Sequence, residues 1–89
     1  MPIIVDLRNH KPQIADRYRL YSKVMIRDGR VSGGWIKIRE LSGKIITILK
    51  VNGKSLTVAL RSGTNVSVFS IVTKGSFKVL PIKAEKLRS

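Results

Sequence analysis

The segment "YRLYSKVMIRDGRVSGGWIKIR", from Tyr18 to Arg39, alternates apolar side chains with lysine and arginine. An alternation with a period of two places successive side chains on opposite faces of a β-strand. The Asp-Gly pair near its centre favours a two-residue hairpin turn. The segment therefore predicts two antiparallel strands with one apolar and one cationic face. In the first strand, the apolar positions are Tyr18, Leu20, Val24 and Ile26, and the cationic positions are Arg17, Arg19, Lys23 and Arg27.

Further glycine turns recur at short, regular intervals along the chain. They are "RDGR" at 27–30, "LSGK" at 41–44, "VNGK" at 51–54, "RSGT" at 61–64 and "TKGS" at 73–76. The segments between them are rich in Val, Ile, Thr and aromatic residues, which is typical of strands. We expect a loop at 8–16 and strands near 2–7, 17–27, 30–40, 44–51, 54–61, 65–73 and 76–82.

These signals predict an all-β fold, a small antiparallel β-barrel or sandwich built as an OB/SH3-like meander of about five to seven short strands. A chain of 89 residues is the size of one domain. We place this domain at 1–82 and expect 83–89, "KAEKLRS", to form a basic C-terminal tail, frayed or ending in a helical turn. The size, basicity and strand rhythm resemble the OB-type, SH3-like and Sm-like barrels that bind nucleic acid, although no motif selects one of them.

The Asn52-Gly53 pair predicts a second hairpin. A two-residue turn there places Leu49 opposite Leu56 and gives a core face. The core residues expected from this register are Ile45, Leu49, Val51, Leu56, Val58 and Leu60. Ile46 and Ile48 then lie on the reverse face, where we expect them to be half covered or to meet a partner.

In the strand that follows Asp28-Gly29, the face on which each side chain lies (its parity) depends on Gly33 and Gly34. Strict alternation from the turn sends Trp35 inward as a core anchor. We expect instead a β-bulge at the two glycines, which adds one residue and reverses the parity of everything after it. With the bulge, Ile36 and Ile38 join the core, while Trp35, Lys37 and Arg39 join the cationic face.

Charge is the strongest indication of function. The chain has 18 Lys and Arg against 5 Asp and Glu, a formal net charge of +13. Self-repulsion on this scale favours a polyanionic partner, and nucleic acid is preferred over an anionic membrane or a merely soluble basic surface.

Cations neutralise phosphates and aromatic rings stack on bases. We therefore predict binding of low sequence specificity to nucleic acid, with single-stranded DNA or RNA favoured. The predicted binding residues are Arg17, Arg19, Tyr21, Lys23, Arg27, Arg30, Trp35, Lys37 and Arg39, and Lys44, Lys54, Arg61 and Lys74 at the turns could widen the surface.

The composition argues against several other classes. There is no cysteine and a single histidine, His10, so no thiolate metal site, disulfide or catalytic triad is expected. The five carboxylates are scattered and no phosphate-loop motif is present, so we expect no catalytic residues, metal or cofactor and no enzyme. No apolar run has membrane-spanning length, which predicts a cytoplasmic protein, within the host cell if viral.

Two alternatives remain open from the sequence. The chain could be a structural or assembly protein, such as a viral coat-like subunit, in which Ile46 and Ile48 form a subunit interface. A homo-oligomer, with a dimer favoured, would also lengthen the cationic surface. The second alternative is a regulator that binds duplex DNA through a two-stranded β-ribbon.

Overall fold

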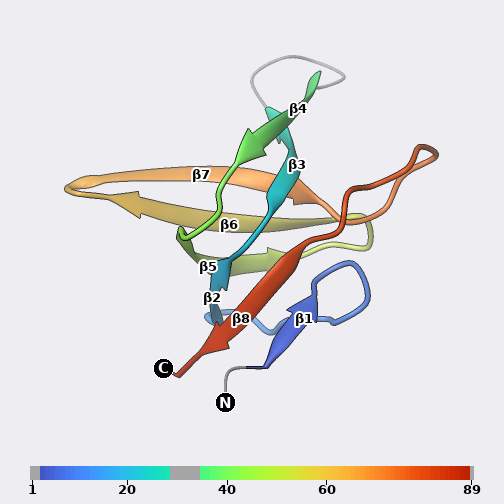
Figure 1. Cartoon of the computed structure of the whole chain (residues 1–89). Helices are drawn as coiled ribbons and strands as arrows, with labels where there is room; N and C mark the ends of the chain where they lie inside the picture. The colour runs from blue at the N-terminus through green and yellow to red at the C-terminus, as the bar shows by residue number, and fades with distance from the viewer. Residues whose placement is uncertain (1–2, 29–34, 89) are drawn as a thin grey trace.

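The computed structural model describes residues 3–28 and 35–88, with the backbone alone for Asp28 and Trp35. The described residues form eight strands and no helix. All strand pairs are antiparallel, and the sheet curls into a half-barrel (Figure 1). The strands are β1 (Ile4–Asp6), β2 (Arg17–Leu20), β3 (Lys23–Asp28), β4 (Trp35–Glu40), β5 (Ile45–Val51), β6 (Ser55–Ser62), β7 (Asn65–Val72) and β8 (Lys83–Leu87). The prediction of an all-β antiparallel fold is confirmed.

The curl of the sheet follows from the order of its strands, β1-β8-β2-β5-β6-β7-β3-β4. β2 and β3 are consecutive in the chain, yet β2 pairs with β5 and β3 pairs with β7. The run 17–28 therefore contacts both outer strands of the β5-β6-β7 unit. Figure 1 shows this run crossing the three strands. The sheet must bend to allow both pairings, and the bend creates an interior for the core.

The predicted strand 17–27 is divided at Tyr21 and Ser22 by contacts with Pro81 and with Lys83, the first residue of β8. The Tyr21 amide donates a hydrogen bond to the Lys83 carbonyl at 2.9 Å. The Ser22 hydroxyl donates to the Pro81 carbonyl at 3.1 Å and accepts from the Lys83 amide at 3.2 Å. These hydrogen bonds fix the point at which the run turns from the β5 side of the sheet to the β7 side.

The core lies on the inner face of the curled sheet. The apolar positions predicted for the run 17–27 are all buried, which confirms that alternation. Burial raises the pKa of the Tyr18 hydroxyl, and the nearby Asp16 carboxylate acts in the same direction. The fully buried side chains include Tyr18, Leu20, Val24, Ile46, Ile48, Val58, Ile71 and Ile82.

The predicted register of the β5–β6 hairpin is wrong. The Asn52 amide donates to the Ser55 carbonyl, so the two turn residues are Gly53 and Lys54 instead of Asn52 and Gly53. A second irregularity, between Ile48 and Lys50, leaves Leu49 as an extra residue in β5. A β-bulge of this kind reverses the parity of the strand beyond it.

The bulge at Leu49 changes which side chains of β5 are buried. Ile46 and Ile48 lie opposite Leu60 and Val58 and are completely buried. Leu49 is 43% exposed on the outer face. The interface that the assembly hypothesis assigned to Ile46 and Ile48 is therefore part of the domain's own core. The prediction held for β6, where Leu56, Val58 and Leu60 are buried.

The predicted parity of β4 is also wrong. Val24 lies opposite Arg39 and Ile26 lies opposite Lys37. Opposed residues of an antiparallel pair share one face. Lys37 and Arg39 therefore lie on the inner face with the core residues of β3, and not with Lys23 and Arg27. The proposed bulge at 33–34 lies outside the described residues.

The isoleucines of β4 occupy the outer face. Ile36 lies opposite Arg27 and Ile38 opposite Met25, and Ile38 is 62% exposed. Since β4 ends the sheet and pairs with β3 alone, the core does not depend on its side chains. A strand at this position can carry cations on its inner face and apolar residues on its outer face.

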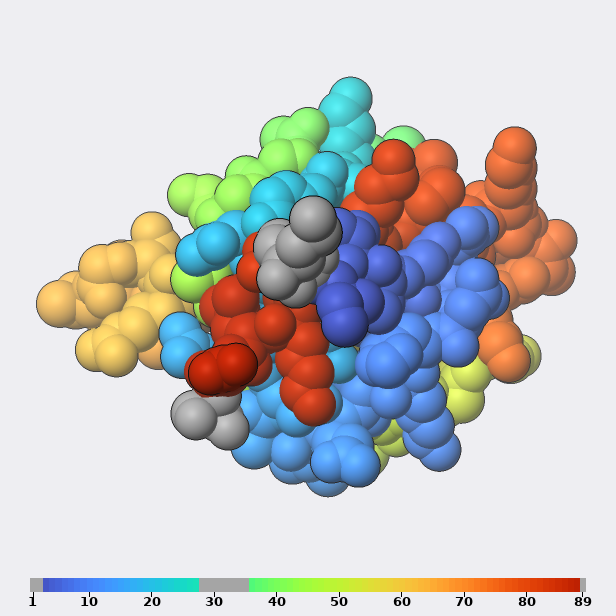
Figure 2. All heavy atoms as spheres, turned by 60° about the horizontal axis from the view of Figure 1, so that its bottom comes forward, coloured from blue at the N-terminus to red at the C-terminus, as the bar shows by residue number. Residues whose placement is uncertain are grey.

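The C-terminal segment differs from the expected tail. Lys83–Leu87 form β8, which lies between β1 and β2, whereas 76–82, predicted as a strand, form none. Ala84 is completely buried, opposite Val5 and Leu20. Figure 2 shows the N-terminal and C-terminal segments side by side on the surface. The sequence did not predict this strand because its composition is polar, with Ala84 as its single buried residue.

Across residues 3–28 and 35–88, no helix is long and apolar enough to cross a membrane.

Candidate nucleic-acid interface

Four of the predicted binding residues lie in a row on the outer face of the sheet. Arg17 and Arg19 come from β2 and Lys23 and Arg27 from β3, and we call these four residues the cationic run. Arg17, Lys23 and Arg27 are exposed, and Arg19 is half-buried. The buried side chains between them hold the strands against the core. The predicted cationic face of this segment is thus present.

Tyr21 lies at the bend in the middle of the cationic run. Its side chain is 43% exposed, and its hydroxyl donates a hydrogen bond to Glu85 Oε1. The same Glu85 oxygen lies 3.9 Å from Arg19 Nη1. Glu85 of β8 therefore positions the aromatic ring and the neighbouring guanidinium together. The ring keeps part of its surface open to solvent.

The two ends of the cationic run have no acidic residue opposite them. Arg17 lies opposite Thr47 and Leu87. Arg27 lies opposite Ser70 and Ile36. In contrast, Lys23 lies opposite Glu40, whose carboxylate also accepts hydrogen bonds from Ser42. These hydrogen bonds from Ser42 lower the pKa of Glu40, with a smaller contribution from the charge of Lys23.

Lys37 and Arg39 form a separate site on the inner face. The Arg39 guanidinium carbon lies 5.4 Å from the centre of the Phe69 ring, a cation–π contact between β4 and β7. Sequence reasoning did not identify Phe69, because only the sheet order brings β7 near β4. The structure therefore divides the predicted surface between two faces. Of the remaining predicted residues, Arg30 and the Trp35 side chain lie outside the described part of the chain.

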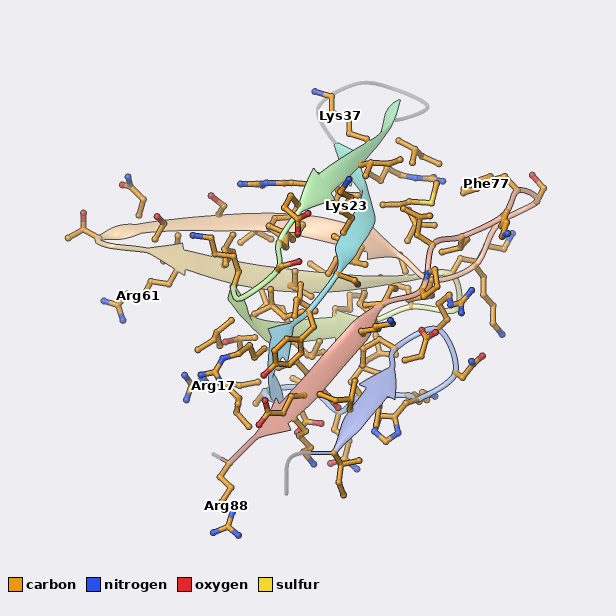
Figure 3. All side chains as sticks on the ribbon, viewed as in Figure 1. Arg17, Lys23, Lys37, Arg61, Phe77 and Arg88 are labelled. Carbon is orange, nitrogen blue, oxygen red and sulfur yellow. The ribbon has the colours of Figure 1, made fainter. Side chains whose placement is uncertain are left out.

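The turn cations Lys44, Arg61 and Lys74 also divide into two groups, and Lys54 lines neither of the two hollows. Lys44 and Arg61 line one hollow together with Arg17, on the outer face. Lys74 lines a different hollow with Arg8 and Lys11, where the loop after β1 meets the segment after β7. Only the first pair extends the cationic run. Figure 3 shows Arg17 and Arg61 reaching out on the same side of the molecule.

Most of the positive charge has no ionic partner among the described side chains. These contain three ion pairs, Arg8–Asp6 at 2.7 Å, Lys86–Asp16 at 3.8 Å and Arg19–Glu85 at 3.9 Å. The few acids therefore compensate few of the cations. A surface of this kind attracts polyanions over several ångströms and does so more strongly at low salt.

The described residues contain no group of three or more His, Asp or Glu side chains that could hold a metal ion. Comparison of the chain with protein-family models, with curated proteins and with solved structures finds no match in any of the three. The geometry and charge of the outer face are therefore the observations that bear on the function of this chain.

Proposed function

We propose that this chain binds nucleic acid with low sequence specificity, through the cationic run of β2 and β3. The observation that supports the proposal best is the outward orientation of Arg17, Arg19, Lys23 and Arg27 along one nearly continuous run of chain. Lys and Arg that contact phosphates contribute affinity without reading the base sequence.

The spacing of the cations suits an extended polyanion. Residues two apart on a strand are separated by about 6–7 Å. Arg17 and Arg19 can therefore contact different phosphates of one strand, and Lys23 and Arg27 continue the row beyond the bend. Each contact would release condensed counterions, so affinity should fall as the salt concentration rises.

A single strand is the favoured ligand because of Tyr21. Its partly exposed ring lies within the row of cations, where an unpaired base can stack on it. Bases in a duplex are already stacked and do not offer their faces. The nucleic acid can be DNA or RNA, because neither phosphate contacts nor stacking depend on the sugar.

The test is a salt titration of binding to fluorescein-labelled oligo-dT and oligo-rU, measured by fluorescence anisotropy. A double variant, Arg17→Ala with Arg27→Ala, removes the two cations that have no acid opposite them. If each contacts one phosphate, the slope of log K against log salt should become shallower by about 1.4 for a single strand. A double-stranded competitor should displace the single strand poorly.

The matched control is Lys74→Ala with Lys78→Ala, which removes the same charge from an exposed loop away from the cationic run. This variant should retain most of the affinity and the original slope. Equal losses in both double variants would mean that diffuse charge, and not the cationic run, binds the oligonucleotide. Affinity that is insensitive to salt would refute the electrostatic mechanism altogether.

The assembly-protein alternative assigned the subunit interface to Ile46 and Ile48. Both side chains are completely buried in the core and cannot contact another subunit. Sedimentation of the protein without nucleic acid tests the expected homo-oligomer separately from nucleic-acid binding.

A further inference from the structure

A second surface on the outer face combines apolar side chains with cations. Leu49 of β5 is 43% exposed, and Val66 and Val68 of β7 are each 60% exposed. Leu49 and Val66 line the hollow that also contains Ile45, and its volume is about 730 Å³. We call this hollow the outer groove. Its cationic rim is formed by Arg17, Lys44 and Arg61.

The outer groove is a consequence of the strand registers. Arg17, Thr47, Ala59 and Val68 lie opposite one another across β2, β5, β6 and β7. The small side chains of Thr47 and Ala59 leave a depression between larger neighbours. The bulge in β5 turns Leu49 toward this side, and the β6–β7 hairpin extends the surface through the pair Arg61 and Val66.

The hairpin that carries Val66 is well defined. Its two-residue turn, Gly63–Thr64, connects the paired residues Ser62 and Asn65, and Gly63 adopts a positive φ of 61°. Figure 1 shows the hairpin extending beyond the rest of the sheet. Exposed apolar residues gathered around a hollow and bordered by polar groups are typical of surfaces that contact a partner.

The chemistry of the outer groove selects the class of partner. The floor is aliphatic and, among the described residues, the lining includes no aromatic side chain on which a base could stack. The rim has three cations, and the described lining includes no carboxylate. A segment that fits should therefore present aliphatic side chains to the floor and carboxylates to the rim.

A second copy of this chain fits poorly. Its five acids are isolated in the sequence, and in the one aliphatic segment that contains an acid and no cation, 3–7, the Asp6 carboxylate is paired with Arg8. Two copies would also bring like charges together, since each has a net charge of +13. The outer groove is therefore better suited to a segment of a different protein than to a second copy of this chain.

We propose that the outer groove docks an acidic, aliphatic segment of another protein. Leu49 and Val66 contact its aliphatic side chains, and Arg17, Lys44 and Arg61 bind its carboxylates. This activity is separate from nucleic-acid binding, although Arg17 belongs to both surfaces and Lys44 and Arg61 extend the cationic run. The acidic segment and nucleic acid therefore compete for these cations.

The test begins with selection of binders from a random peptide library displayed on phage, with the full chain as bait. Selected peptides should combine Asp or Glu with Leu, Ile or Val. A fluorescein-labelled copy of the selected peptide should bind at least tenfold more weakly to Leu49→Ser with Val66→Ser, and also to Arg61→Glu. The matched control is Ile38→Ser, an aliphatic residue 62% exposed on the outer face of β4, which should bind the peptide as the unchanged chain does.

Three results would overturn the proposal. The first is a selection that yields no peptides, or peptides whose binding is the same in all the variants. The second is a homodimer in sedimentation that Val66→Ser dissociates, which would assign the outer groove to a second copy. The third is a loss of oligo-dT affinity in Leu49→Ser with Val66→Ser as large as the loss of peptide affinity, which would assign it to bases. Unchanged oligo-dT affinity in this variant supports the proposal, and absence of oligo-dT binding in the unchanged chain would refute the proposed function alone.

Discussion

Asp6 connects three parts of the chain through a single carboxylate. Its oxygens accept hydrogen bonds from the backbone and side chain of Arg8, at 2.7 to 3.1 Å, and from the Ile82 amide at 3.1 Å. The Arg8 guanidinium in turn donates to the Val79 carbonyl at 3.0 Å. These contacts attach β1 to the irregular segment 73–82, which has no strand pairing of its own.

The hydrogen bonds from Arg8 lower the pKa of Asp6 from 3.8 to about 2. Because the pKa is depressed in the folded state, the stabilisation is present above about pH 4 and is lost as the pH falls toward about 2. The free energy of unfolding should therefore decrease by up to about 2 kcal/mol over this range. Urea denaturation at a series of pH values measures the decrease.

The Asp6→Asn variant should be less stable than the unchanged chain at neutral pH and should show a smaller decrease between about pH 4 and 2. Glu40→Gln is the comparison, because the Glu40 carboxylate is exposed and its hydrogen bonds come from Ser42, two residues further along the chain. An unchanged pH dependence in Asp6→Asn would mean that other carboxylates cause the acid sensitivity.

Single residues were predictable from sequence where the cause is local. The alternation of Tyr18, Leu20, Val24 and Ile26 with cations needs only the geometry of one strand, so it identified the buried and exposed positions. The contact of Tyr21 with Glu85 joins residues 64 apart in sequence and has no local signal.

At the scale of the strand, the bulge in β5 explains the largest error in the predicted core. A turn displaced by one residue and one extra residue at Leu49 together decide which face of β5 is buried. Sequence alternation alone cannot locate a bulge, because both faces of β5 carry aliphatic residues. The register was decided by the burial of Ile46 and Ile48 against β6.

Deletion of Leu49 should therefore be tolerated unusually well. The pairs Ile48–Val58, Lys50–Thr57 and Val51–Leu56 can all persist without it. Deletion of Thr57 on the partner strand is the control, since it should send Leu56 to the outer face. We expect the Thr57 deletion to unfold the domain and the Leu49 deletion to retain a cooperative urea transition. Comparable loss of structure in both would show that the bulge itself is needed for the curl.

β8 shows a second limit at the scale of the strand. Its sequence, Lys83–Leu87, is mostly charged, so composition favoured a tail. Its place between β1 and β2 provides the hydrogen bonds that stabilise it, and these partners are distant in sequence. The apolar segment before it was predicted as a strand but forms none.

At the scale of the whole molecule, the excess of positive charge opposes compaction. Three ion pairs among the described side chains engage three of the 18 Lys and Arg, and the net charge of the chain is +13 with every acid counted. The repulsion is reduced by salt, which shortens the Debye length from about 30 Å at 0.01 M to about 8 Å at 0.15 M. The folded state should therefore become more stable as salt is added.

We expect the thermal midpoint to rise by several degrees when sodium chloride is increased over this range, as measured by circular dichroism. The variant Lys74→Glu with Lys78→Glu lowers the net charge and should show a smaller rise. A midpoint that falls with added salt would indicate that ion pairs contribute more to stability than repulsion removes.

The general architecture was predictable because turns and alternation repeat throughout the chain. The order of the strands was not predictable, since it depends on which distant segments bury the most apolar surface together. The candidate interface likewise has a part that local sequence predicts and a part that depends on the order of the strands. The cationic run belongs to one segment, whereas Lys44, Arg61 and Phe69 join their sites only through the sheet order.

The pairing of β1 with β8 has a consequence for biosynthesis. Among the described strands, β8 is the single partner of β1 and the last of the eight to leave the ribosome. While the intervening residues emerge, β1 has no strand to pair with, and the place between it and β2 stays vacant. The nascent chain can assemble β5, β6 and β7 early, but insertion of β8 must be the step that completes the domain.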